Sequence, residues 1–166
     1  LYSPFDALWA VSAQVYQVRQ RDYKQLLKFS KLRNYKTETG HVTFYLKEPR
    51  SNTLLTLSGG RYLAKDSGIT VDFSRRFKSG MVLGAYFTKT DISDAEFGEG
   101  SFDKGFYLNF PIEAFFTNYR KGLTSFGLRP MTRDGGAKLI VGHDLYGVTD
   151  EGSYMHIARD KGDLYD

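Results

Sequence analysis

Cysteine is absent from the 166 residues, which excludes a disulfide framework and thiolate chemistry. Proline occurs only four times, as suits a chain of strands and tight turns, because proline cannot donate a hydrogen bond inside a sheet. No stretch approaches the roughly 18 consecutive apolar residues of a transmembrane helix, and the mean hydropathy is −0.42. The sequence therefore excludes helical membrane spans, whereas a membrane barrel would place its apolar residues at every second position.

Charge is present but is not gathered into blocks. The 23 Lys and Arg residues exceed the 19 Asp and Glu residues and give a net charge of +4, with a pI of about 9.2. Such a surface could attract anionic glycans, lipopolysaccharide or nucleic acid. Because no run of five or six like charges occurs, we expect no nucleic-acid partner.

Aromatic residues are abundant, at 16% of the chain. They favour strands and also populate the interfacial girdles of membrane barrels. Apolar and polar residues alternate with a period of two along most of the chain, which predicts strands. The clearest case is a hairpin with a glycine turn at 78–80. The apolar residues that share one face of this hairpin are Ile69, Val71, Phe73, Phe77, Met81, Leu83, Ala85 and Phe87.

Similar alternation predicts further strands on both sides of this hairpin. These segments are 9–16, 41–47, 55–57, 105–112, 126–128 and 139–141. A bulge or sharp bend is expected at Gly59 and Gly60. The total is about eight strands, several of them near the 9–11 residues of a tilted membrane strand.

The predicted connections alternate in length, with long ones at 20–40 and 91–103 and short ones at 48–53 and 78–80. Outer-membrane barrels have the same asymmetry, with short periplasmic turns and longer external loops. We therefore predict an all-β antiparallel meander that forms a transmembrane-type β-barrel or a segment of a larger barrel. Residues 1–143 supply its strands, and residues 144–166 form a C-terminal tail that is irregular or contains a short helix at 154–159.

The polar column of these strands reads as a lumen lining, because it mixes small residues, charges and tyrosines. Its members are Thr70, Asp72, Ser74, Arg76, Gly84, Tyr86, Thr88, Tyr107 and Asn109. The apolar column lacks the alternation of large and small residues that fills a small closed interior. The sequence thus favours lipid outside and a polar interior, with a soluble sheet as the alternative.

No catalytic or cofactor motif occurs, so we expect neither an enzyme nor a cofactor. The histidines, His41, His143 and His156, have no ligand-spaced partner, and no metal site is expected. An acidic stretch with glycines contains Asp91, Asp94, Glu96, Glu99 and Asp103. It could bind Ca²⁺ or present two carboxylates for glycoside hydrolysis, but a solvated external loop is favoured.

Two polar groups are candidates for glycan contacts. Aromatic faces with charged hydrogen-bonding groups suit sugars, and the lumen set consists of Tyr62, Asp72, Arg76, Tyr86 and Tyr107. The second set comprises possible loop contacts: Glu96, Glu99, Asp103, Arg133 and Asp134. Ordinary lumen filling and a glycine turn after Asp134 are the alternatives.

Four stretches resemble the YjbH family. They are GGRYLAKDSG at 59–68, DFSRRF at 72–77, FGEGSFDKG at 97–105 and RPMTRDGG at 129–136. The resemblance covers roughly residues 16–146, and 98–105 is its most specific part. It implies a β-barrel outer-membrane protein of Gram-negative bacteria, often a lipoprotein, that takes part in exopolysaccharide or capsule biosynthesis. It supplies no catalytic residues.

Family members are considerably longer, so the resemblance implies the C-terminal portion of such a protein. Residues 1–6 have no basic region followed by an apolar one, so we expect that a signal peptide was removed or that the chain is an internal piece. The chain ends in GDLYD rather than in a strand with a terminal aromatic residue. This departure leaves open whether these residues alone close a barrel.

The leading hypothesis is a non-enzymatic outer-membrane barrel that assists export or surface assembly of an exopolysaccharide or capsule. Its expected partners are outer-membrane lipid, an anionic or neutral polysaccharide and other polysaccharide-secretion proteins. The alternative is a soluble or peripheral β-sheet module that binds glycans or lipids. A barrel hydrolase or acyltransferase would need a nucleophile–base pair, which the sequence does not offer.

Overall fold

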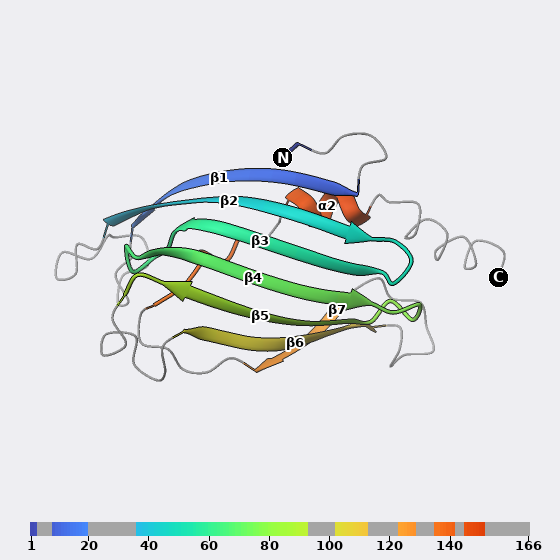
Figure 1. Ribbon diagram of the computed structural model, residues 1–166. Helices are drawn as coiled ribbons and strands as arrows, with labels where there is room; N and C mark the ends of the chain where they lie inside the picture. Colours follow the sequence, from blue (N-terminus) through green and yellow to red (C-terminus); the bar gives the residue numbers. More distant parts are fainter. Residues whose placement is uncertain are drawn as a thin grey trace.

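The computed structural model describes residues 1–2, 8–19, 36–92, 102–112, 123–128, 135–141 and 145–151. Within them the chain forms one antiparallel sheet of seven strands, each paired with its neighbours in sequence (Figure 1). The elements are β1 (Trp9–Arg19), β2 (Lys36–Glu48), β3 (Thr53–Arg61), β4 (Ser67–Arg76), β5 (Val82–Thr90), β6 (Asp103–Pro111), β7 (Leu123–Leu128) and helix α2 (Leu145–Glu151). The predicted all-β antiparallel meander is confirmed.

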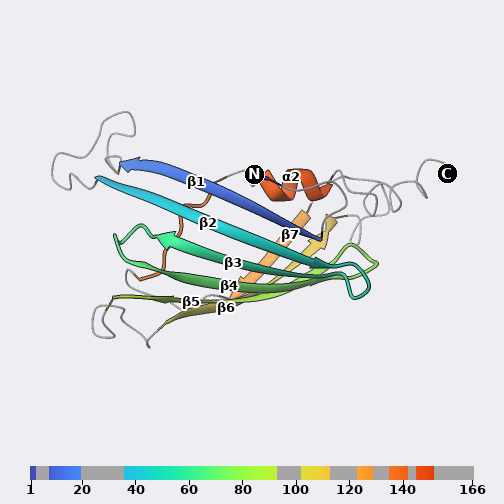
Figure 2. The same cartoon turned by 45° about the horizontal axis from the view of Figure 1, so that its top comes forward.

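The sheet is curved and open. Strands β1 and β7 form its two edges and do not pair with each other in the described part of the chain. Figure 2 shows β6 and β7 turning back toward the side on which α2 lies. We call this side the concave face and the opposite side the convex face. The described residues thus form a trough, not a closed barrel.

The predicted bulge at Gly59 and Gly60 is wrong. Strand β3 pairs without interruption with β2 and β4, so that Gly60 lies between His41 and Gly68. A Cβ atom on Gly60 would lie 2.7 Å from the Cα atom of His41. Glycine is required here because the backbones crowd together on the concave face of a curved sheet, not because a residue is inserted.

The connections lie at two ends of the sheet. We call the end where β1, β3 and β5 finish the long-loop end; it holds the connections 20–35, 62–66 and 91–102. The short-turn end holds 49–52, 77–81 and 112–122. At 77–81 the amide of Gly80 donates to the carbonyl of Phe77 at 3.0 Å, and Gly80 has a φ of 81°. The predicted glycine turn of the central hairpin is confirmed.

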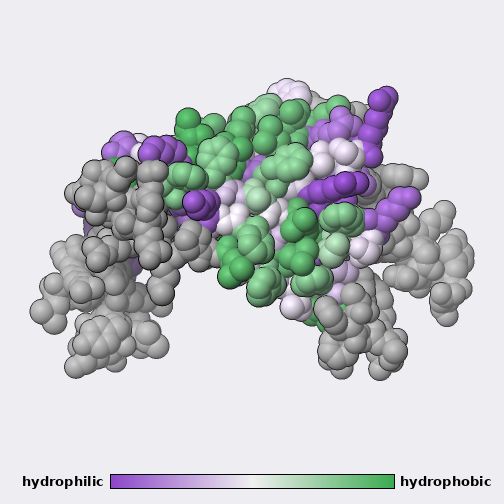
Figure 3. Space-filling view, turned by 60° about the horizontal axis from the view of Figure 1, so that its bottom comes forward, coloured by the Kyte–Doolittle hydropathy of each residue, from purple (hydrophilic) through white to green (hydrophobic). Residues whose placement is uncertain are grey.

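The two faces differ in chemistry as the alternation predicts. Large apolar side chains are exposed on the convex face, where Figure 3 shows a hydrophobic region between hydrophilic ends. Exposure reaches 81% at Val15, 59% at Ile69 and 54% at Phe73. The concave face carries buried small polar residues: Thr39, Thr43, Ser58, Ser74 and Thr88. For these strands, the polar column lies on the concave face and the apolar column on the convex face, as the alternation predicts.

Two segments that follow β7 lie on the concave side. Residues 135–141 cross it, and the strand predicted at 139–141 is wrong. This segment forms no continuous strand pairing with the sheet and contacts it through individual hydrogen bonds, such as that from the amide of Leu63 to the carbonyl of Ala137 (2.9 Å). Ile140 is 89% exposed. Helix α2 follows, whereas the helix predicted at 154–159 lies outside the described residues. None of the described residues forms a helix long and apolar enough to cross a bilayer.

Candidate functional site

A cavity of about 470 Å³ lies between the concave face of the sheet and the segments 135–141 and α2. Small-molecule sites usually have volumes of about 300–1,000 Å³. The sheet contributes hydroxyl, carboxylate and phenol groups to one wall, whereas Leu139, Ile140 and Val141 contribute an apolar wall. This mixture suits a ligand that has hydroxyl groups on its edges and apolar faces.

Asp72 and Tyr107 form the centre of the polar wall. The hydroxyl of Tyr107 on β6 donates to Oδ1 of Asp72 on β4 at 3.0 Å, reaching across β5. Gly84 is opposite Tyr107 in the register of β5 and β6, and the Tyr107 ring lies against it. Tyr86 and Gly105 repeat this arrangement two residues along. The absence of a side chain on each glycine lets the opposite phenol reach over the neighbouring strand.

A row of hydroxyl groups runs beside the cavity. The phenol oxygen of the fully buried Tyr62 is 2.6 Å from Oγ1 of Thr70, which is 2.8 Å from Oγ1 of Thr88. The Tyr62 ring packs edge-on against His41, with centroids 4.7 Å apart. Burial raises the pKa of the Tyr62 phenol above its usual value, so the group keeps its proton at neutral pH. Through its contacts with Thr70 and His41, Tyr62 holds the β3–β4 connection against the sheet.

The five predicted lumen residues share the concave side but not one role. Asp72, Tyr86 and Tyr107 line the cavity. Tyr62 lies beside the cavity and is buried. Arg76 is half-buried on the same face at the end of β4 and is not part of the cavity wall.

Asp103 is not the loop residue that the sequence suggested. It begins β6, where it pairs with Thr88, and its side chain is 1% exposed on the concave face, where it lines the cavity. Because Asp103 pairs with Thr88 of β5, it belongs to the sheet and not to the preceding acidic stretch. The other predicted loop contacts, Glu96, Glu99, Arg133 and Asp134, lie outside the described residues.

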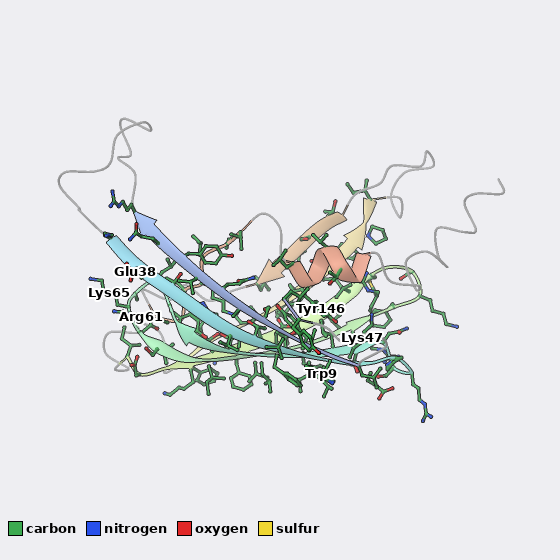
Figure 4. All side chains as sticks on the ribbon, turned by 90° about the horizontal axis from the view of Figure 1, so that it is seen from above. Trp9, Glu38, Lys47, Arg61, Lys65 and Tyr146 are labelled. Atoms are coloured by element: carbon green, nitrogen blue, oxygen red, sulfur yellow. The ribbon has the colours of Figure 1, made fainter. Side chains whose placement is uncertain are left out.

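Residues 135–141, which we call the strap, are fastened to the sheet by polar contacts that the sequence analysis missed. The hydrogen bonds run from Gly136 N to Asp66 Oδ2 (2.9 Å) and from Lys138 Nζ to Ser58 Oγ (2.7 Å). Beyond the strap, Tyr146 of α2 stacks on Tyr45 of β2, with centroids 4.1 Å apart (Figure 4). The available signal was the glycine pair at 135–136, since Gly136 has a φ of 72° that suits its close approach to the sheet.

His41 lies on the concave face and is only 9% exposed. His143 and His156 lie outside the described residues. In the part of the chain that the structure describes, no three His, Cys, Asp or Glu side chains are close enough together to hold a metal ion. The described groups of this site can form hydrogen bonds and ring contacts.

Comparison with known proteins agrees with the resemblance found in the sequence. The YjbH family model, with the description "Exopolysaccharide biosynthesis protein YbjH", matches residues 1–151. The lipoprotein YjbH of Escherichia coli (strain K12) is 38% identical over 154 residues, which cover 92% of this chain and 22% of that protein. No solved structure matches the chain. The family match includes all strands of the trough and the strap, and this chain belongs to the YjbH family of exopolysaccharide biosynthesis proteins.

Proposed function

We propose that this chain is part of an outer-membrane β-barrel that assists export or surface assembly of an exopolysaccharide or capsule, without catalysing a reaction. In this proposal the convex face contacts the hydrocarbon of the bilayer, and the concave face lines the interior and contacts the polysaccharide. Its partners are outer-membrane lipid, the polysaccharide and other secretion proteins.

The observation that carries the proposal is the exposure of the convex face. Leu83, Phe87, Phe106 and Phe126, on three successive strands, are between 45% and 54% exposed. A soluble sheet buries such a column against another layer, whereas a membrane barrel turns it toward lipid. Strands β1 to β6 have 9 to 13 residues, about the length needed to cross a bilayer at a tilt.

An open sheet edge is not tolerated in hydrocarbon, because its backbone groups would lack hydrogen-bond partners. The proposal therefore requires further strands to pair with β1 and β7. The chain spans 22% of the length of its E. coli relative, so a protein of that length has ample sequence to supply them.

The cavity supports the link to polysaccharide. The carboxylate of Asp72 and the phenols of Tyr86 and Tyr107 can hydrogen-bond to sugar hydroxyls, and aromatic rings can contact sugar faces. The family description names exopolysaccharide biosynthesis, and the E. coli relative is a lipoprotein, which agrees with membrane association.

Cell fractionation tests the location. We expect the full-length protein in the outer-membrane fraction, resistant to extraction by salt and by carbonate. Recovery of the intact protein from the soluble periplasm as a monodisperse monomer would rule the barrel out and favour a soluble glycan-binding sheet.

Surface polysaccharide tests the role. Deletion of the gene is expected to reduce it, and the wild-type gene is expected to restore it. The variant Tyr107→Phe, which cannot donate to Asp72, should restore less than the control Tyr2→Phe, since Tyr2 is exposed and does not line the cavity. Unchanged surface polysaccharide in the deletion strain would contradict a role in export or assembly.

A further inference from the structure

The charged residues of the convex face are distributed unevenly between its two ends. At the long-loop end, the outward strand positions hold five basic residues and one acidic residue, Glu38, and the exposed Asp91 directly follows β5. The basic residues, which we call the basic rim, are Arg19, Lys36, Arg61, Lys89 and Lys104, and all five are exposed. At the short-turn end the outward strand positions hold only Glu48 and Arg75. Counted over outward strand positions, the net charge is thus +4 at the long-loop end and zero at the short-turn end, and with Asp91 the long-loop end carries +3.

The basic rim runs at an incline across the strands. Arg61 pairs with Ser67 of β4, which is hydrogen-bonded to Asp91, so Arg61 lies level with Asp91 just beyond the end of β5. Lys104 pairs with Phe87, which is four residues nearer the middle of β5. This shift accumulates over the three steps from β3 to β6. With about 3.3 Å per residue and about 4.8 Å between strands, the line inclines by about 40°. Strands of outer-membrane barrels tilt by about 35–45°, so the rim would lie at a single depth in a membrane.

The basic rim directly borders the exposed apolar surface. In the register, Lys89 is opposite Ile69, and Lys104 is opposite Phe87. Ile69 and Phe87 are 59% and 47% exposed. A long basic side chain beside an apolar surface places its stem on that surface and its charge in the adjoining polar layer. The rim therefore marks the boundary between hydrocarbon and headgroups.

The rim also concentrates like charges. Arg19 and Lys36 are directly opposite each other in the register of β1 and β2, an arrangement that destabilises a sheet. Figure 4 shows Arg61, Lys65 and Glu38 at this same end of the sheet. Anionic groups of a lipid at this end would reduce the repulsion between Arg19 and Lys36.

We propose that the basic rim binds the phosphate groups of lipopolysaccharide in the outer leaflet of the membrane. This inference rests on the proposed membrane function. Long connections face the outside in barrels of this kind, so the long-loop end lies at the outer leaflet. Basic residues at a membrane surface bind anionic lipid through charge, each contributing independently at short range. The rim faces lipid, and the cavity of the concave face is not involved.

The test uses the full-length protein reconstituted into vesicles of phosphatidylcholine, alone or with lipopolysaccharide or with phosphatidylglycerol. The rim variant carries Arg61→Gln, Lys89→Gln and Lys104→Gln. The matched control carries Arg50→Gln, Arg75→Gln and Lys78→Gln, which removes the same charge from exposed positions at the short-turn end. The readout is lipopolysaccharide bound per protein at low and at high salt.

We expect the wild type and the control to bind lipopolysaccharide about equally, and the rim variant to lose about tenfold or more in apparent affinity. High salt should weaken binding by the wild type much more than binding by the rim variant. If the rim variant inserts normally and binds as much lipopolysaccharide as the control, the inference is wrong, whereas the proposed barrel is unaffected. Equal enrichment of phosphatidylglycerol would overturn the assignment to lipopolysaccharide. Failure of the wild type to insert into any vesicle would count against the barrel itself.

Discussion

At the scale of single residues, the place of Tyr107 in the cavity depends on a glycine of the neighbouring strand. A Cβ atom on Gly84 would lie 2.7 Å from Cε1 of Tyr107, so Gly84→Ala must displace the ring that donates to Asp72. We expect a loss of about 1–3 kcal/mol in the free energy of unfolding, as for other overpacked sites. Urea titration of the full-length protein measures it.

The control for this prediction is Gly59→Ala on the convex face. There a new Cβ atom would meet nothing nearer than a backbone oxygen at 3.9 Å, and stability should change little. Equal losses in the two variants would mean that the Tyr107 ring does not depend on the space above Gly84.

The face of each residue could be predicted from the sequence, but its contacts could not. Period-two alternation alone places Asp72, Tyr86 and Tyr107 on one side. Which of these side chains touch depends on the register of β6 against β5. The two strands are joined by a long connection, whose length does not fix that register. The same limit explains Asp103, which reads as a loop residue in sequence and is drawn into β6 by its pairing with Thr88.

At the scale of elements, the strap should depend on Asp66. Its Oδ2 atom accepts the hydrogen bond from Gly136, and the side chain is only 6% exposed. Asp66→Ala should release residues 135–141, and their amides should exchange hydrogen faster, as should the amide of Leu63 that donates to Ala137. Asp66→Asn keeps an acceptor oxygen and should largely preserve protection.

The matched control for the strap is Asp91→Ala. Asp91 accepts a hydrogen bond from the amide of Ser67 at the same end of the sheet, but this bond does not involve the strap. Faster exchange in residues 135–141 of the control as well would show that any change at the long-loop end loosens the strap.

Strand elements with clear alternation were predictable, whereas the strap and the course of β3 were not. Three apolar residues at 139–141 satisfy a strand pattern, but they join no strand of the sheet, and the segment crosses the concave face instead. Gly59 and Gly60 look like a bulge in sequence because a curved sheet and a bulge both call for residues without side chains. Tertiary crowding, which a single strand does not reveal, decides between them.

At the scale of the whole molecule, alternation predicted that the sheet would be polar inside and apolar outside, and the exposures agree. Closure could not be predicted from these residues. A sheet closes only when its strand number, tilt and register are mutually consistent. In the described part of the chain the edge strands β1 and β7 do not pair with each other, which leaves that condition to other sequence.

Lysine substitutions on the two faces of β7 can distinguish a convex face in lipid from one in water. Ser125 and Phe126 are adjacent on β7, on opposite faces, and both are exposed. In water, lysine at either position should change stability by about 0.5 kcal/mol or less. In a membrane, Phe126→Lys would cost up to about 2–4 kcal/mol near the midplane, whereas Ser125→Lys would remain on the polar side. We therefore expect Phe126→Lys to deplete the full-length protein from the outer-membrane fraction relative to Ser125→Lys; equal recovery of the two variants would mean that the convex face does not meet hydrocarbon.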